Sequence, residues 1–214
     1  MKTNRTELVF ILDRSGSMAG LESDTIGGYN AMLKKQQAQA GEVRVTTVLF
    51  DDKIELLHDR LELAAVAPLT EKEYYARGCT ALLDAMGSTI GKIANVQRSV
   101  SEEYRADKVL FVITTDGYEN ASREFDADQV KRMVKERQEK DGWEFIFLGA
   151  NIDAVSTAGR FGIGADHAVN YCPDAQGTAL NFDVVSETVS HVRTGARVNR
   201  NWKKRIEADY KKRG

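Results

Sequence analysis

The chain has few cysteines and histidines, the residues that form the disulfides of small secreted proteins or bind zinc. Its 214 residues include two cysteines, Cys79 and Cys172, which lie far apart and give neither a disulfide framework nor a zinc-binding spacing. The three histidines show no H-x-x-H spacing. No apolar run approaches the roughly 18 residues of a membrane span. These absences exclude a disulfide scaffold and a spanning helix, and they favour free thiols in a reducing compartment.

The termini and the charge distribution predict one domain with a basic tail. The N-terminal residues lack the pattern of a signal peptide, so we expect a cytoplasmic protein without membrane contact. From residue 193 to 214, nine residues are Lys or Arg and two are Asp or Glu, whereas the rest of the chain is acidic. We therefore expect a domain over 1–192 and a solvated, partly helical tail over 193–214.

Strand and helix signals alternate along the chain, which predicts an α/β fold. Only Asp51 and Asp52 separate the second and third expected strands, and so short a link requires an antiparallel hairpin. The other strands are separated by helices, which predicts a Rossmann-like, doubly wound and mostly parallel six-stranded sheet with one antiparallel edge strand. The expected strands are 7–13, 43–50, 53–58, 108–115, 143–148 and 167–171, and the expected helices are 24–39, 80–103, 126–140, 153–161 and 178–192.

The most informative pattern follows the first strand. The buried-strand run Leu8–Leu12 is followed at once by Asp13, Ser15 and Ser17 at alternate positions. The carboxyl ends of strands in open α/β sheets are where ligands bind. One carboxylate and two hydroxyls are hard oxygen donors, which suit Mg²⁺ better than a soft metal.

Two further segments supply the same kind of donor. Thr80 stands at the mouth of an expected helix, and Asp116 ends the apolar strand that begins at Val109. The pattern D-x-S-x-S, a distant Thr before a helix, and T-D-G after a strand resembles the von Willebrand factor A domain. The resemblance covers residues from about Thr6 to about residue 192, and its strength comes from having all three elements in this order.

The resemblance implies a metal-ion-dependent adhesion site. Its ligands would be Asp13, Ser15, Ser17, Thr80 and Asp116, and its metal Mg²⁺ or Mn²⁺. A protein partner would complete the metal's coordination with an Asp or Glu carboxylate, so the expected function is binding and not catalysis. Small stand-alone relatives of this type occur in bacteria and phages, which is the type that this chain resembles.

Four neighbouring residues are expected to form a partner-binding rim. Arg14 and Met18 flank the metal turn and are expected to face the partner or solvent. Glu119 follows the second strand end, where it would either join the rim or orient the loop, and Asn151 lies at another strand end. Asp51 and Asp52 are expected in a solvated turn.

Three other interpretations stay open at this point. Asp13 and Ser15 also suit a helix cap or a turn without a metal. Asp13 after a strand resembles the nucleophile of a Mg²⁺-dependent phosphohydrolase, although Ser15 replaces that family's usual general acid. The basic tail, with Trp202 within it, suits nucleic-acid binding or docking on the body of the domain.

Overall fold

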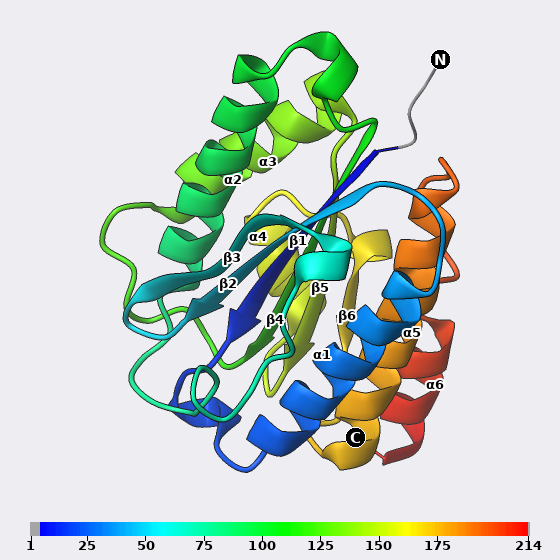
Figure 1. Cartoon of the computed structure of the whole chain (residues 1–214). Helices are drawn as coiled ribbons and strands as arrows, with labels where there is room; N and C mark the ends of the chain where they lie inside the picture. The colour runs from blue at the N-terminus through cyan, green and yellow to red at the C-terminus, as the bar shows by residue number, and fades with distance from the viewer. Residues whose placement is uncertain (1–4, 214) are drawn as a thin grey trace.

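The computed structural model describes residues 5–213, so the extreme ends of the expected N-terminal segment and basic tail lie outside the described residues. Strands and helices alternate through most of the chain, as expected (Figure 1). The strands are β1 (Thr6–Asp13), β2 (Val43–Phe50), β3 (Ile54–Glu62), β4 (Lys108–Asp116), β5 (Glu144–Ala150) and β6 (Ala168–Asn170). The helices are α1 (Glu22–Gln37), α2 (Leu82–Ser99), α3 (Ala127–Asp141), α4 (Ala154–Arg160), α5 (Ala175–Arg193) and α6 (Lys204–Arg213).

The six strands form one sheet in the order β3-β2-β1-β4-β5-β6. All neighbouring strands are parallel except β2 and β3, which pair as the antiparallel hairpin that the short Asp51-Asp52 link predicts. The predicted fold class is therefore confirmed. The direction of winding reverses between β1 and β4, and ligands of open α/β sheets bind at the carboxyl ends of such a pair.

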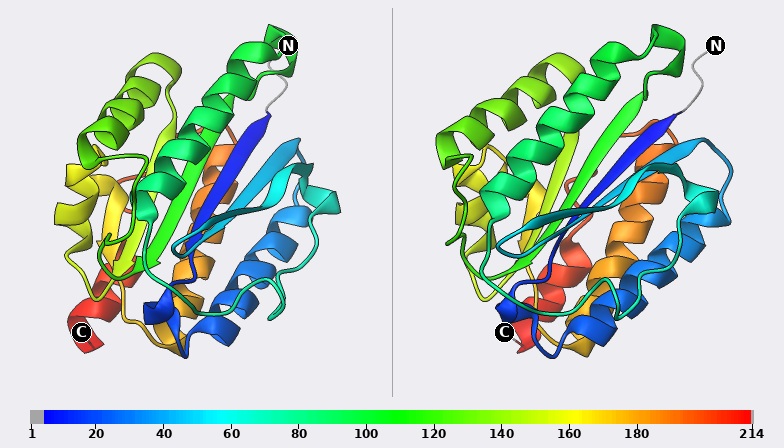
Figure 2. Two further views of the ribbon diagram at one scale, coloured as in Figure 1. Left: turned by 90° about the vertical axis from the view of Figure 1, so that its left-hand side faces the viewer. Right: turned by 60° about the vertical axis from the view of Figure 1, so that its left-hand side comes forward.

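Helices cover both faces of the sheet, as the views in Figure 2 show. On one face α1, α5 and α6 pack through Tyr29, Phe182 and Ile206, all of which belong to one buried cluster. On the other face α2, α3 and α4 bury residues such as Met86 and Val130. Residues of β1 alternate between the two clusters, because successive side chains of a strand point to opposite faces. None of the helices in residues 5–213 is long and apolar enough to cross a membrane.

One of the two adjacent glycines in α1 allows the close contact between α1 and α5. A Cβ at Gly28 would lie 2.3 Å from Cδ2 of Phe182, whereas a Cβ at Gly27 would meet nothing within 4 Å. Gly28 therefore allows the phenyl ring of α5 to approach the backbone of α1, while Gly27 makes no such approach.

Residues 193–213 do not form the solvated tail that their charge predicts. Helix α5 runs on to Arg193, and the chain then returns along the domain to form α6, in which Ile206 is 1 % exposed. Trp202 is also buried, and its indole Nε1 donates to the carbonyl of Asp166 at 2.9 Å. The prediction of a solvated tail is wrong because these two apolar side chains dock the segment on the body.

Candidate functional site

The carboxyl ends of β1 and β4 bring Asp13 and Asp116 together at the lower end of the sheet in Figure 1. Asp13 is fully buried, and both of its carboxylate oxygens accept hydrogen bonds. Its Oδ1 accepts from the amide of Ser15 at 2.7 Å, and its Oδ2 accepts from the Thr115 hydroxyl at 2.7 Å and the Asp116 amide at 3.2 Å. Asp13 therefore fixes both the turn that follows β1 and the end of β4.

The two serines of the turn present adjacent hydroxyls. Ser15 is buried and Ser17 is exposed, and their Oγ atoms lie 3.0 Å apart. Gly117 approaches them from the end of β4, since a Cβ on Gly117 would lie 3.2 Å from Oγ of Ser17. The turn and the loop after β4 thus meet at the serine hydroxyls.

The loop that carries Thr80 is joined to the same turn. The amide of Gly16 donates to the carbonyl of Gly78 at 3.1 Å, and Gly78 has a φ of +67°. Thr80 is buried, and its amide donates to Oδ1 of Asn120 at 2.9 Å. The amide of Asn120 in turn donates to the carbonyl of Thr80 at 3.0 Å. The structure therefore gathers the three segments that carry Asp13, Thr80 and Asp116.

The carboxylates at this edge are held by amides and hydroxyls. Nδ2 of Asn151 donates to Oδ1 of Asp116 at 2.5 Å. Burial raises the pKa of Asp13, opposed by its bonds from Ser15 and Thr115, and burial also raises the pKa of Asp116 against the bond from Asn151. Burial therefore opposes the ionised form of both carboxyl groups.

Two of the four rim residues do not point outward. Arg14 is 1 % exposed and Met18 is 3 % exposed, so the prediction that both face a partner or solvent is wrong. Met18 packs in the core beneath the turn, and Arg14 is directed into an ion-pair network. Asn151 is exposed and contacts Asp116, which keeps it at the rim.

Glu119 orients the loop, which is one of the two roles expected for it. Its Oε2 accepts from the amide of Leu83 at 2.9 Å, and its Oε1 accepts from the amides of Ala121 and Ser122 at 2.9 and 2.7 Å. It thereby ties the loop after β4 to the first turn of α2. Its place in a partner-binding rim stays a prediction.

The burial of two further carboxylates at this edge was not predicted from the sequence. Asp84 of α2 is buried and accepts from three consecutive amides, those of Arg123, Glu124 and Phe125, at 2.8, 2.9 and 2.8 Å. Asp51 is fully buried and not in a solvated turn. The sequence indicates only that Asp84 is an acidic residue near the start of an apolar helix. An acidic residue there is also expected from its favourable interaction with the helix dipole, so its role in holding the loop could not be inferred.

A depression of about 520 Å³ adjoins the serine turn. Its lining comprises Ser17, Ala19, Gly20, Leu21, Asp24, Asp116, Asn151, Pro173, Asp174 and Ala175. Among the described residues, this lining includes three aspartates and no Lys, Arg or His. The surface beside the candidate site is therefore acidic.

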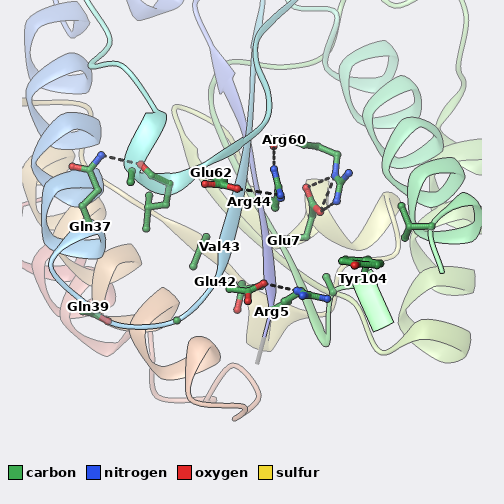
Figure 3. A pocket seen from close by; sticks show the side chains of 16 residues that line it. Arg5, Glu7, Gln37, Gln39, Glu42, Val43, Arg44, Arg60, Glu62 and Tyr104 are labelled. Atoms are coloured by element: carbon green, nitrogen blue, oxygen red, sulfur yellow. Dashed lines mark hydrogen bonds and ion pairs between the residues drawn. The ribbon is translucent and has the colours of Figure 1, made fainter. Parts of the chain in front are cut away.

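A larger cavity of about 780 Å³ lies at the opposite edge of the sheet (Figure 3). Its charged side chains are already paired, with Glu7 bonded to Arg60, Glu42 to Arg5, and Glu62 to Arg44. Three arginines thus balance three glutamates, and the cavity presents no net charge to a ligand.

The residues at the carboxyl edge fit a hard cation. Within residues 5–213 there is no cluster of three or more His, Cys, Asp or Glu side chains that could hold a metal ion, so a cation here would depend on hydroxyls and water as well as on carboxylates. The donors gathered here are two hydroxyls and two carboxylates in a partly desolvated setting. Oxygen donors together with retained water match the coordination of Mg²⁺.

The geometry does not favour the two alternative activities. The Asp13 carboxylate is fully buried with both oxygens hydrogen-bonded, so nucleophilic attack on phosphorus would require it to give up those bonds, whereas it can balance the charge of a nearby cation through water. In the C-terminal segment, Arg205 pairs with Asp183 and Glu187, and Arg213 pairs with Asp174. These basic side chains bind the domain itself, which weakens the case for a nucleic-acid surface.

No protein-family model and no curated protein matches the chain. Solved structures do resemble it. The von Willebrand factor type A protein from Catenulispora acidiphila gives a TM-score of 0.58 at 13 % identity over 87 % of this chain and 43 % of that one. The von Willebrand factor domain of the pilus tip protein Mfa5 from Porphyromonas gingivalis gives 0.57 at 13 % identity over 91 % and 98 %.

A third similar structure is proximal thread matrix protein 1 from the mussel byssus. It gives a TM-score of 0.56 at 13 % identity, over 86 % of this chain and 45 % of that one. The chain thus spans less than half of this protein and of the Catenulispora protein. At these identities the likeness establishes the fold, which is that of von Willebrand factor A domains.

Proposed function

We propose that the chain is a metal-dependent protein-binding module and not an enzyme. Asp13, Ser15, Ser17, Thr80 and Asp116 would hold Mg²⁺ or Mn²⁺, as the sequence pattern predicts. The observation that carries the proposal is the meeting of the serine turn, the Thr80 loop and the loop after β4 at one edge, beside two buried aspartates that are bonded by hydroxyls and amides. A divalent cation would supply the positive charge that would offset the cost of burying them.

The partner would be a protein that offers an Asp or Glu carboxylate. A bound cation would leave a coordination position for that carboxylate at the exposed side of the site. Ser17 and Asn151 are exposed there, whereas Asp13 is buried beneath, so an incoming group meets the hydroxyl side first. A crystal form of the mussel protein is described with a zinc-occupied site of this motif, which supports metal binding by the fold.

A cytoplasmic location is part of the proposal. Cys79 is exposed and Cys172 is buried, and both are free thiols. An exposed free thiol is compatible with a reducing compartment.

Thermal stability measured against Mg²⁺ and Mn²⁺, with and without acetate, tests the proposal. A ligand that binds only the folded state stabilises it by about 2.7 kcal/mol at 100 times its dissociation constant. We expect a metal-dependent rise in Tm for the wild type that acetate enhances, because acetate supplies the external carboxylate.

Two variants and a control make that experiment specific. Asp13→Asn keeps the shape of the buried side chain, and Ser17→Ala changes an exposed hydroxyl whose loss leaves the fold intact. Both should lose the metal-dependent rise. Asp24→Asn, in the same depression but outside the ligand set, should keep it. The same metal response in wild type and both variants would refute the site.

A further inference from the structure

Arg14 lies between two candidate metal ligands in the sequence, yet its side chain is directed away from them. Its Nε donates to Oδ2 of Asp51 at 2.9 Å. Its Nη1 reaches Oε2 of Glu55 at 2.8 Å and the carbonyl of Glu73 at 2.9 Å. One guanidinium therefore contacts the end of β2, the start of β3 and the loop that leads to Thr80.

Asp51 connects the same elements from the other side. Its Oδ2 also accepts from Nε of Arg77 at 2.7 Å, and its Oδ1 accepts from the amide of Lys53 at 2.8 Å. Its main-chain carbonyl accepts from the amide of Ala81 at 2.8 Å, next to Thr80. Burial favours the neutral form of Asp51, but the bonds from Arg77, Lys53 and Arg14 outweigh it and lower its pKa.

Main-chain hydrogen bonds extend this network to the metal turn. The amide of Arg14 donates to the carbonyl of Phe50 at 2.8 Å, and the amide of Arg77 donates to the carbonyl of Arg14 at 2.9 Å. With the bond from Gly16 to Gly78 at 3.1 Å, the turn after β1 and the loop before α2 are held side by side. The side chains of Arg14 and Asp51 therefore lie where the turn, the end of β2 and the Thr80 loop are joined by main-chain bonds.

We propose that Arg14 and Asp51 are positioning residues that hold the Thr80 loop against the Ser15–Ser17 turn. This inference rests on the proposed function, because it concerns the same metal site. Mg²⁺ requires near-ideal octahedral geometry, so a small shift of one loop weakens binding. A buried ion pair adds little net stability compared with apolar side chains of similar volume, so the gain from this pair lies in fixing geometry.

The affinity for Mn²⁺ tests the proposal, measured by electron paramagnetic resonance of the free ion at a temperature where every variant is folded. Arg14→Met and Asp51→Asn should each bind Mn²⁺ about 10-fold more weakly than the wild type, the loss typical of residues that orient metal ligands. Arg14→Lys keeps the charge but cannot span the three acceptors, so it should restore affinity only in part. Arg60→Met, which breaks the buried pair with Glu7 at the opposite edge, should lower stability and leave Mn²⁺ affinity unchanged.

Hydrogen exchange of the metal-free protein separates positioning from general destabilisation. In Arg14→Met the amides of Gly16, Arg77 and Ala81 should exchange faster, while core amides of β4 keep their protection. Arg60→Met should leave those three amides unaffected.

The outcomes are distinct. If the wild type binds Mn²⁺ and Arg14→Met binds equally well, the positioning role is overturned and the proposed function stands. If the wild type does not bind Mn²⁺, the positioning role and the proposed function are both refuted. If Arg14→Met is unfolded, Arg14→Lys and Asp51→Asn decide by the same criteria.

Discussion

At the amino edge of the sheet each glutamate of the cavity is paired with an arginine, whereas at the carboxyl edge Asp13 and Asp116 are bonded by hydroxyls and amides. Arginines are present at the carboxyl edge too, but Arg14 and Arg77 are directed to Asp51. Buried carboxylates therefore have arginine partners at both edges, Glu7 at the amino edge and Asp51 at the carboxyl edge, whereas Asp13 and Asp116 are held by amides and hydroxyls. The proposed cation site lies beside these two carboxylates.

Breaking the pair of Glu7 with Arg60 at the amino edge should have a large effect on stability. Arg60→Met leaves Glu7, which is 1 % exposed, without its bidentate partner. Removal of one member of a buried ion pair costs roughly 3 kcal/mol, because the other charge stays buried. We expect a loss of that size in urea denaturation without metal. Adding Glu7→Gln should recover most of it, and a loss below about 1 kcal/mol in Arg60→Met would contradict the role of the pair.

The pH dependence of stability should have opposite signs for Glu7 at the amino edge and for Asp51 at the carboxyl edge. Burial raises the pKa of Glu7 despite Arg60, so the native state binds more protons than the unfolded state just above the usual glutamate pKa, and stability falls as pH rises there. The pKa of Asp51 is lowered, so its contribution is present above the usual aspartate pKa and is lost as pH falls through the lowered value.

Urea denaturation between pH 2.5 and 6.5 measures the free energy of unfolding against pH. The curve should have an acidic limb, which Asp51 causes, and a limb that descends as pH rises, which Glu7 causes. Each group changes the slope of the unfolding free energy against pH by at most about 1.4 kcal/mol per pH unit. Glu7→Gln should flatten the descending limb alone, and Asp51→Asn should flatten the acidic limb alone. The comparison fails if the two variants alter the same limb.

The smallest effect is expected at Asn151, whose amide is bonded to Asp116. Asn151 has a φ of +54°, so Asn151→Gly removes the amide without straining the backbone. A hydrogen bond contributes about 1 kcal/mol, which predicts an approximately fivefold loss of Mn²⁺ affinity by titration. Asp153→Ala, which removes the cap of α4 at the same edge, should retain affinity. Unchanged affinity in Asn151→Gly would show that its amide plays no part in binding.

Much of the fold could be predicted from local patterns. The alternation of apolar strands and helices, and the short link at Asp51-Asp52, were sufficient for the sheet with its antiparallel edge. Helix ends were less accurate, and α5 begins at Ala175 because the side chain of Asp174 caps it by accepting from the amide of Gly177. For the C-terminal segment, its charge favoured a solvated tail over the alternative of docking through Trp202, and the structure shows the docked segment, with Trp202 and Ile206 buried.

The direction in which each side chain of the site points could not be predicted in the same way. Arg14 and Met18 lie in the same turn as Ser15 and Ser17, and their spacing along the chain does not show which of these side chains point into the core and which point to solvent. Met18 is buried because the 3₁₀ turn at Gly16–Met18 rotates it into the core. Arg14 is buried because Asp51, 37 residues away, accepts its hydrogen bond.

The sequence by itself determined where the oxygen donors stand along the chain, since the apolar runs of β1 and β4 end at Asp13 and Asp116 and strand ends in a parallel sheet share an edge. Only the tertiary structure decided which carboxylates receive an arginine and which do not. That choice depends on contacts between residues tens of positions apart, and the strength of each contact depends on burial, which no local pattern contains.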